Sequence, residues 1–150
     1  TSDRVRENAF NLIGPVDGAR VLDLFAGSGA LGLEALSRGA ASVVFVESSR
    51  DACRQINANL DKLHLEGTVL CQDAGRALAA ERGTYDLVLC DPPYGSWSAL
   101  EEDLAELLPP VVADDGLLVV ETDSRTEPRL PLPLATTRRY GSARITLYRR

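Results

Sequence analysis

Four consecutive residues, Asp91, Pro92, Pro93 and Tyr94, follow an almost wholly apolar run at positions 85–90. Short apolar runs bounded by turn residues predict buried parallel strands, and open α/β sheets bind ligands beyond the carboxyl ends of such strands. Two successive prolines hold the backbone in an extended path and cannot donate hydrogen bonds. A carboxylate, a rigid carbonyl and an aromatic ring are therefore expected to converge on one point.

This combination of groups suits a planar exocyclic amine. Asp91 and the Pro92 carbonyl can accept its two hydrogens, while Tyr94 can stack on the attached ring. The lone pair of such an amine is delocalised into the ring, so holding both hydrogens favours the geometry in which nitrogen attacks an external electrophile. The alternative is a strand that ends in a proline turn with a surface Asp. The flanking Asp and Tyr favour the functional interpretation.

A second apolar run, at positions 21–25, leads into the glycine-rich residues 26–32. Glycines let the backbone approach a ligand, and a following helix offers free amide donors, which predicts a nucleotide-type cofactor. The string also matches G-x-G-x-x-G, with Glu47 at about the spacing of a ribose-binding acid in dinucleotide enzymes. Asp23, however, stands four residues before Gly27, where it would repel a pyrophosphate and attract the ammonium of a methionine moiety. S-adenosylmethionine therefore fits better than NAD.

Residues 23–29 and 91–94 together resemble the class I S-adenosylmethionine-dependent amino-methyltransferases. Residues 1–7, 32–40 and 45–47 narrow the resemblance to the RsmD family, and it covers nearly the whole chain. This resemblance implies methylation of the N2 amine of a guanine in bacterial 16S ribosomal RNA. The partner would be that RNA or a small-subunit assembly particle.

The resemblance also implies a Rossmann-like α/β fold, with a seven-stranded, mostly parallel sheet in the order 3-2-1-4-5-7-6, an antiparallel edge hairpin and helices on both faces. Glu47 would bind the ribose hydroxyls and Asp73 the adenine amino group, with the Ala74 amide near the ring. The alternatives are a surface carboxylate at Glu47 and a helix N-cap at Asp73. The other cofactor-binding residues that we predict are Asp23, Phe25, Ala26, Gly27, Ser28, Gly29 and Ser48.

Local patterns predict alternating helices and strands, and hence a parallel sheet that a final hairpin extends with an antiparallel strand. The predicted helices are one capped by Asp3 and ended by Gly14, one from about Leu31 to Gly39, one from Cys53 to Leu63, a short one after Asp73, and one opened by a capping box at Ser98–Glu101 and ended by Pro109. The predicted strands are 20–25, 42–47, 68–71, 85–90, 117–121, and two that flank residues 140–142.

The composition predicts one domain over residues 1–150. The chain is 45% hydrophobic and 25% charged, which is ordinary for a globular domain, and we expect a soluble, cytoplasmic monomer. Cys53, Cys71 and Cys90 are far apart and His64 is the only histidine, so neither a disulfide framework nor a metal site is expected. The three cysteines are interpreted as small buried residues.

The charge balance is unusual for a protein that grips RNA phosphates. The net charge is −6 and the sequence pI is about 4.8, although residues 124–150 carry seven arginines and one acid. The first helix offers Arg4, Arg6 and Glu7 as candidate substrate contacts, with a solvated helix face as the alternative. Trp97 is another candidate, with packing against the sheet as its alternative. We also expect a short basic RNA-binding extension before Thr1.

Other functions use the same amine-holding residues. An adenine-N6 methyltransferase or a protein-glutamine methyltransferase would hold a planar amine or amide in the same way. The glutamine enzymes usually carry Asn in place of Asp91, and a DNA enzyme would need a target-recognition region for which this length leaves no space. A different class is a cofactor-binding module for ribosome assembly, in which catalysis is dispensable.

Overall fold

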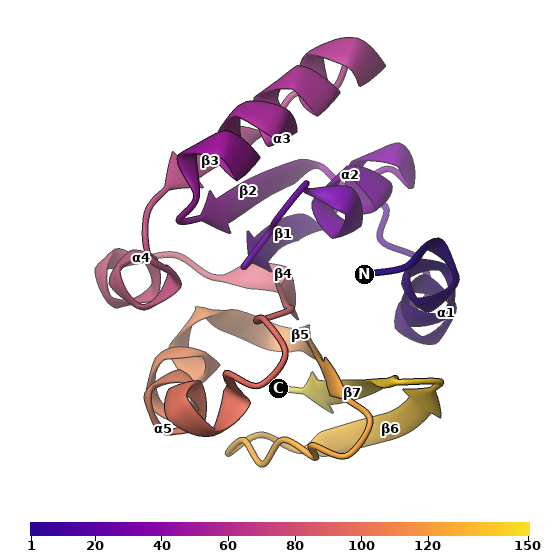
Figure 1. The fold of residues 1–150 in the computed structure, drawn as a ribbon, viewed down its shortest axis with the longest axis vertical. Helices are drawn as coiled ribbons and strands as arrows, with labels where there is room; N and C mark the ends of the chain where they lie inside the picture. Colours follow the sequence, from indigo (N-terminus) through magenta and orange to yellow (C-terminus); the bar gives the residue numbers. More distant parts are fainter.

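The computed structural model describes residues 1–150, whose seven strands form one sheet (Figure 1). The strand order is β3-β2-β1-β4-β5-β7-β6, as predicted. The strands are β1 Arg20–Leu24, β2 Ser42–Glu47, β3 Thr68–Cys71, β4 Tyr85–Cys90, β5 Val112–Asp123, β6 Leu134–Tyr140 and β7 Ala143–Arg149. The helices are α1 Asp3–Ile13, α2 Ala30–Ser37, α3 Arg50–Leu63, α4 Ala74–Ala80 and α5 Trp97–Leu107, followed by the 3-10 helix η1 Pro109–Val111.

The first five strands are parallel, and β6 and β7 form the predicted antiparallel hairpin at one edge. β1 pairs with β2 and β4, and β4 pairs with β5, all in parallel. β7 runs antiparallel to both β5 and β6. β1 and β4 are neighbours, but the strand that follows β1 lies on one side of this pair and the strand that follows β4 lies on the other. Their carboxyl ends therefore form the topological switch point at which such sheets bind ligands.

Two apolar cores lie on the two faces of the sheet. α1, α2 and α3 contribute Phe10, Leu33 and Ile56 to the core on one face. α4 and α5 contribute Leu78 and Leu104 to the core on the other. Figure 1 shows α4 and α5 on the left of the strands and α1 and α2 on the right. None of the helices combines the length and the apolarity that a membrane crossing needs.

Several predicted boundaries were wrong. Ser2, and not Asp3, caps α1, because its side chain accepts a hydrogen bond from the Val5 N–H. α5 begins before the predicted capping box at Ser98, with Ser96 at its N-cap and no side-chain cap bond. β5 runs from Val112 to Asp123 and not from 117 to 121, and residues 113–116, with Asp115 at a φ of 64°, form an irregularity within the strand.

The interpretation of the cysteines was also wrong at one position. Cys53 and Cys90 are buried, as predicted, but Cys71 is exposed. Cys71 ends β3, which lies at the edge of the sheet, so solvent reaches a position that would be covered in a central strand.

α2 packs on β2 at a distance that only glycine permits at Gly32. A Cβ atom at this position would lie 2.3 Å from Cε1 of Phe45 and 2.9 Å from Cγ1 of Val43. Phe45 is fully buried and cannot move away without displacing other core side chains. The β1–α2 loop is therefore held against the sheet by close backbone packing.

Gly32→Ala is expected to destabilise the protein by about 2–3 kcal/mol through overpacking, which lowers Tm by roughly 5–10 °C for a chain of this size. Thermal unfolding of the ligand-free protein measures the effect. Gly83→Ala is the matched control, because its Cβ would meet only ordinary contacts, the nearest at 3.6 Å from Arg20. Equal melting temperatures of the two variants would contradict the packing argument.

Candidate active site

A pocket of about 620 Å³ opens at the carboxyl ends of β1, β2, β4 and β5. The structure brings all but one of the predicted catalytic and cofactor-binding residues to its wall. From the amine-binding motif these are Asp91, Pro92, Pro93 and Tyr94, and from the predicted cofactor site they are Asp23, Phe25, Ala26, Gly27, Ser28, Glu47, Ser48, Asp73 and Ala74. Gly29 lies just behind the wall, where it precedes α2.

The loop between β1 and α2 is a tight turn with three residues in the left-handed region. φ is 57° at Phe25, 59° at Gly27 and 83° at Gly29. A left-handed conformation at a residue with a side chain, as at Phe25, costs roughly 1–2 kcal/mol and persists only where the surroundings impose it. Here the Ala26 N–H donates to the Val46 carbonyl at 3.0 Å and fixes the loop against β2.

The rest of this loop leaves free space toward the pocket and is hydrogen-bonded to α3. A Cβ added at Gly27 would meet no atom within 4 Å, so this backbone leaves room for a ligand. Asn59 of α3 donates from Nδ2 to the Ser28 carbonyl at 3.1 Å. The loop is therefore preorganised before a ligand binds.

Asp23 is a buried carboxylate at the end of β1, with only 1% of its surface exposed. Its Oδ2 accepts a hydrogen bond from the Gly32 N–H at 3.0 Å, near the start of α2. Burial raises the pKa of Asp23 well above its usual value, and the negative charges of Asp91 and Glu47 raise it further, while the Gly32 hydrogen bond lowers it. A cation in the pocket would relieve this unbalanced charge.

Glu47 and Asp73 both reach the pocket but also support the backbone around it. Glu47 accepts from the Gly27 N–H at 2.9 Å through Oε1 and from the Ser49 N–H at 2.8 Å through Oε2. Each carboxylate oxygen keeps a second lone pair for a ligand. Asp73 caps α4 by accepting from the Arg76 N–H at 3.1 Å, so the N-cap alternative describes part of its role.

The Asp91–Tyr94 segment follows β4 and lines the pocket. The turn that follows uses the Pro93 carbonyl, which accepts from the Ser96 N–H at 3.2 Å, while no donor of the chain reaches the Pro92 carbonyl. Burial raises the pKa of Asp91, and a hydrogen bond from the Thr1 hydroxyl opposes this shift. Tyr94 is 53% exposed, so its ring is accessible from the pocket.

Glu121 is a functional candidate to which the sequence analysis gave no role. It lies in β5, is 5% exposed and lines the pocket next to Asp91. The Tyr94 hydroxyl donates to its Oε2 at 3.3 Å. Its position after the apolar residues 117–120 could have indicated a site residue, because Glu47 follows the apolar residues of β2 in the same way. Gln72, Ser142 and Ala143 also line the pocket without having been predicted.

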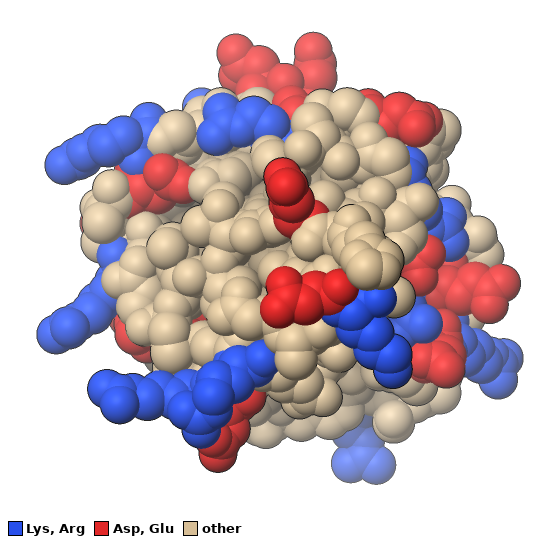
Figure 2. Space-filling view, turned by 90° about the horizontal axis from the view of Figure 1, so that it is seen from above, with Lys and Arg blue, Asp and Glu red and all other residues tan.

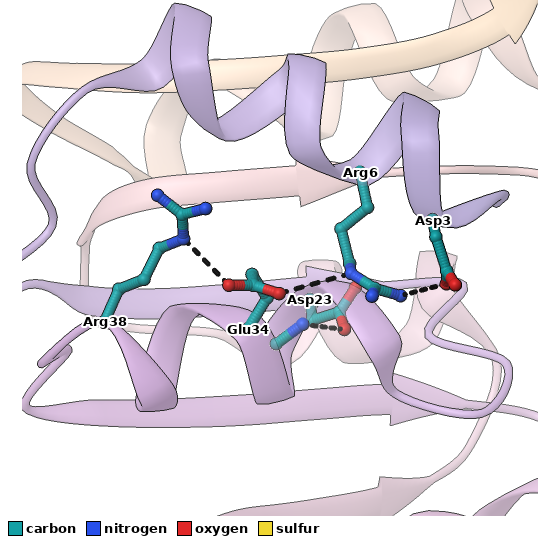
Figure 3. A network of polar contacts seen from close by, with 6 residues as sticks. Asp3, Arg6, Asp23, Glu34 and Arg38 are labelled. Atoms are coloured by element: carbon teal, nitrogen blue, oxygen red, sulfur yellow. Dashed lines mark hydrogen bonds and ion pairs between the residues drawn. The ribbon is translucent and has the colours of Figure 1, made fainter.

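The four predicted substrate contacts lie outside the pocket. Arg6 pairs with Glu34 of α2 and with Asp3, each at 3.2 Å, and Glu34 also pairs with Arg38 (Figure 3). Figure 3 shows this network joining α1 to α2 above Asp23. Arg4 and Glu7 are exposed on α1. Trp97 is the first residue of α5 and is buried in the core, where its Nε1–H donates to Glu101.

The charge of the pocket wall is one-sided. Its titratable side chains include five carboxylates, from Asp23, Glu47, Asp73, Asp91 and Glu121, and no Lys or Arg. Such a wall repels a pyrophosphate and attracts a cation. The negative charge that Asp23 alone predicted therefore extends over the whole pocket wall, which disfavours a dinucleotide cofactor.

A sheet of this strand order, with a glycine-rich turn after β1 and Asp-Pro-Pro-Tyr after β4, defines a class I methyltransferase fold. The model of the family described as "Conserved hypothetical protein 95" matches residues 1–149. The chain belongs to this family, which is the RsmD family.

Individual relatives agree with this assignment. YlbH of Bacillus subtilis (strain 168) is 40% identical, over all of this chain and 86% of its own length. Ribosomal RNA small subunit methyltransferase D of Escherichia coli (strain K12) is 40% identical over 82% of this chain, which corresponds to 63% of that protein's length. Among solved structures, yhhF from Escherichia coli matches with a TM-score of 0.90 and 36% identity, over 99% of this chain and 86% of its own.

Proposed function

We propose that this chain transfers a methyl group from S-adenosylmethionine to the exocyclic N2 amine of a guanine in 16S ribosomal RNA. One observation carries the proposal: an amine-holding segment, Asp91–Tyr94, lines the same pocket as the glycine-rich loop after β1, and the charged side chains of this pocket are all acidic. The name of the Escherichia coli relative, a small-subunit ribosomal RNA methyltransferase, supports the RNA substrate. A ribosomal RNA substrate also agrees with the expected cytoplasmic location.

The pocket residues fit S-adenosylmethionine, which carries two positive charges and no phosphate. Asp23, buried at the end of β1, faces the ammonium of the methionine moiety. Glu47 offers its remaining lone pairs to the ribose hydroxyls. Asp73 accepts from the adenine amino group, with the Ala74 amide near the ring. The open side of Gly27 lets the cofactor lie against the loop.

When bound, the cofactor supplies an electrophilic methyl group, and the electron pair of the broken C–S bond stays on sulfur. Asp91 and the unpaired Pro92 carbonyl hold the two N2 hydrogens, so that the nitrogen lone pair points at the methyl carbon. Tyr94 stacks on the ring of the flipped or unpaired base. After the new N–C bond forms, N2 sheds one proton, which the Asp91 carboxylate is placed to receive, since burial has raised its pKa.

RNA contact must come from a limited part of this acidic chain. The face in Figure 2 mixes Lys and Arg with Asp and Glu around its rim and shows no continuous basic surface. In the basic C-terminal segment, Arg144 and Arg150 donate to backbone or side-chain oxygens within the fold. Arg138 and Arg139 are exposed on β6, where Arg138 donates to Thr136 and Thr137 of its own strand. We propose both arginines as phosphate contacts within a single domain formed by residues 1–150.

Mapping the methylated nucleotide tests the function. The purified protein is incubated with S-adenosylmethionine and either 16S ribosomal RNA or small subunits that lack the modification, and the digested RNA is analysed by mass spectrometry. We expect one N2-methylguanosine, made by the wild type and not by Asp91→Ala. Methylation at adenine N6, or of a protein glutamine, would replace the guanine assignment. A protein that binds the cofactor and methylates nothing would be a ribosome-assembly module.

A further inference from the structure

Asp91 and Glu121 form a pair of carboxylates at the ends of neighbouring parallel strands. Cys90 of β4 and Val120 of β5 are register partners, so Asp91 and Glu121 each lie one residue beyond the last pair. Neighbouring strands are about 4.8 Å apart, and register partners point to the same face. The two side chains therefore project together into the pocket, which both of them line.

A single atom shows how closely the two carboxylates converge. The Thr1 hydroxyl lies within hydrogen-bonding distance of Oδ2 of Asp91 and, at 3.1 Å, of Oε1 of Glu121. A hydroxyl has one proton, so it satisfies only one of the two acceptors at a time. Burial and the charge of Asp91 raise the pKa of Glu121, while the positive charge of the N-terminal amino group and the hydrogen bonds from Thr1 and Tyr94 lower it. The pair would be satisfied by a ligand that presents two N–H donors side by side.

The orientation of Glu121 is fixed by the amine-holding segment itself. Its Oε2 accepts from the Tyr94 hydroxyl at 3.3 Å, while Oε1 faces the point shared with Asp91. Tyr94 therefore links the ring on which a base would stack to the carboxylate at that base's edge. In the strand order, β5 with Glu121 lies on the far side of β4 from β1 and β2, which flank the cofactor loop.

We propose that Glu121 selects guanine by accepting a hydrogen bond from its N1–H, while Asp91 and the Pro92 carbonyl hold the N2 amine. This inference rests on the proposed function. It explains how the amine-holding segment, which suits any planar amine, can be part of a site that distinguishes guanine from adenine. Guanine presents N1–H and the N2 amine as adjacent donors, whereas adenine presents a lone pair at N1 that a carboxylate repels. Bases that leave a buried acceptor unpaired are rejected far more strongly than bases that only fill the space poorly.

The test uses a base that keeps the amine but loses the N1 hydrogen. The target RNA identified by mapping is synthesised with guanine or with 2-aminopurine, which carries the 2-amino group and a lone pair at N1. Values of kcat/KM for methylation of both RNAs are measured for the wild type and for Glu121→Gln. A glutamine amide at position 121 can donate to the N1 lone pair, so it should favour the base that the carboxylate repels.

We expect the wild type to prefer guanine by about 100-fold or more, and Glu121→Gln to lower this preference by at least about 30-fold, as the loss of a charged hydrogen bond predicts. The affinity of Glu121→Gln for S-adenosylmethionine, measured by calorimetry, should stay within about threefold of the wild type, because Glu121 contacts the base and not the cofactor. Glu102→Gln is the matched control, since Glu102 is exposed on α5 away from the pocket, and it should retain the wild-type preference.

Three results would separate this inference from its alternatives. Equal losses on both RNAs in Glu121→Gln would assign Glu121 to structure and overturn the inference. An unchanged preference would overturn it as well. If the wild type binds S-adenosylmethionine but methylates no guanine N2, the proposed function fails first, and this outcome is visible before any variant is compared.

Discussion

Asp91→Ala is expected to lower kcat by about 10³-fold while the affinity for S-adenosylmethionine changes by less than about threefold. The side chain lies at the end of β4, across the pocket from the carboxylates of β2 and β3 that would hold the cofactor's ribose and adenine. Its removal leaves the backbone of the turn in place, because the hydrogen bond that ties this turn to β1 runs from the Asp91 N–H to the Leu24 carbonyl at 3.4 Å.

Single-turnover methylation and cofactor titration measure the two quantities separately. Asp91→Asn keeps an acceptor oxygen in the same place and is expected to retain more activity than Asp91→Ala, with a loss nearer 10-fold, because holding the amine contributes more than accepting its proton. Glu102→Gln controls for the loss of a carboxylate that lies outside the pocket. Loss of cofactor binding with retained turnover would contradict the assignment of Asp91 to the amine.

The parts of the fold that local sequence could predict are those in which an apolar run sets the boundary. β2, β3 and β4 have the predicted bounds, and each contains an apolar run. β5 was predicted too short, because the prediction followed the apolar residues from position 117, although the chain continues through Asp115 and Gly116 as an irregular strand. The pairing of β5 with β4 shifts register between Tyr85 and Leu87. Such a shift depends on both strands, so the sequence of β5 alone does not indicate it.

The candidate site likewise has parts that the sequence predicts and parts that depend on packing between distant segments. Its contiguous parts, the loop after β1 and the Asp91–Tyr94 segment, carry residue types that indicate their chemistry. Glu121 was missed because its relation to Asp91 arises from strand pairing between segments 30 residues apart in the chain. Arg6 looked like a candidate RNA contact, but its partner Glu34 lies on another helix, and only the packing of α1 on α2 reveals the pair.

Asp23→Asn is expected to weaken cofactor binding while it stabilises the ligand-free protein. The lost charge-assisted hydrogen bond to the ammonium should lower the affinity by about 10- to 100-fold. S-adenosylhomocysteine should lose affinity by the same factor, because it keeps the ammonium and lacks only the sulfonium charge. Titration of both ligands measures this, and a loss confined to S-adenosylmethionine would place Asp23 at the sulfonium instead.

The gain in stability follows from the direction of the pKa shift. Burial raises the pKa of Asp23 in the folded state, so the folded protein binds this proton more tightly than the unfolded chain. The stability that Asp23 contributes is therefore fully present below its unfolded pKa and is lost as the pH rises through the higher folded pKa. At neutral pH, Asp23→Asn avoids this loss while its side-chain oxygen can still accept from Gly32.

Thermal unfolding without ligand, at neutral and at acidic pH, tests the stability argument. We expect Asp23→Asn to raise Tm at neutral pH by roughly 2–4 °C, which corresponds to about 1 kcal/mol for a chain of this size. The gain should shrink as the pH falls, because Asp23 of the wild type then takes up its proton in the folded state. Asp61→Asn, on the exposed face of α3, should change neither quantity. A gain that does not depend on pH would show that the buried charge is not its cause. The expected pattern would mean that the ligand-free protein is destabilised by the same carboxylate that binds its cationic cofactor.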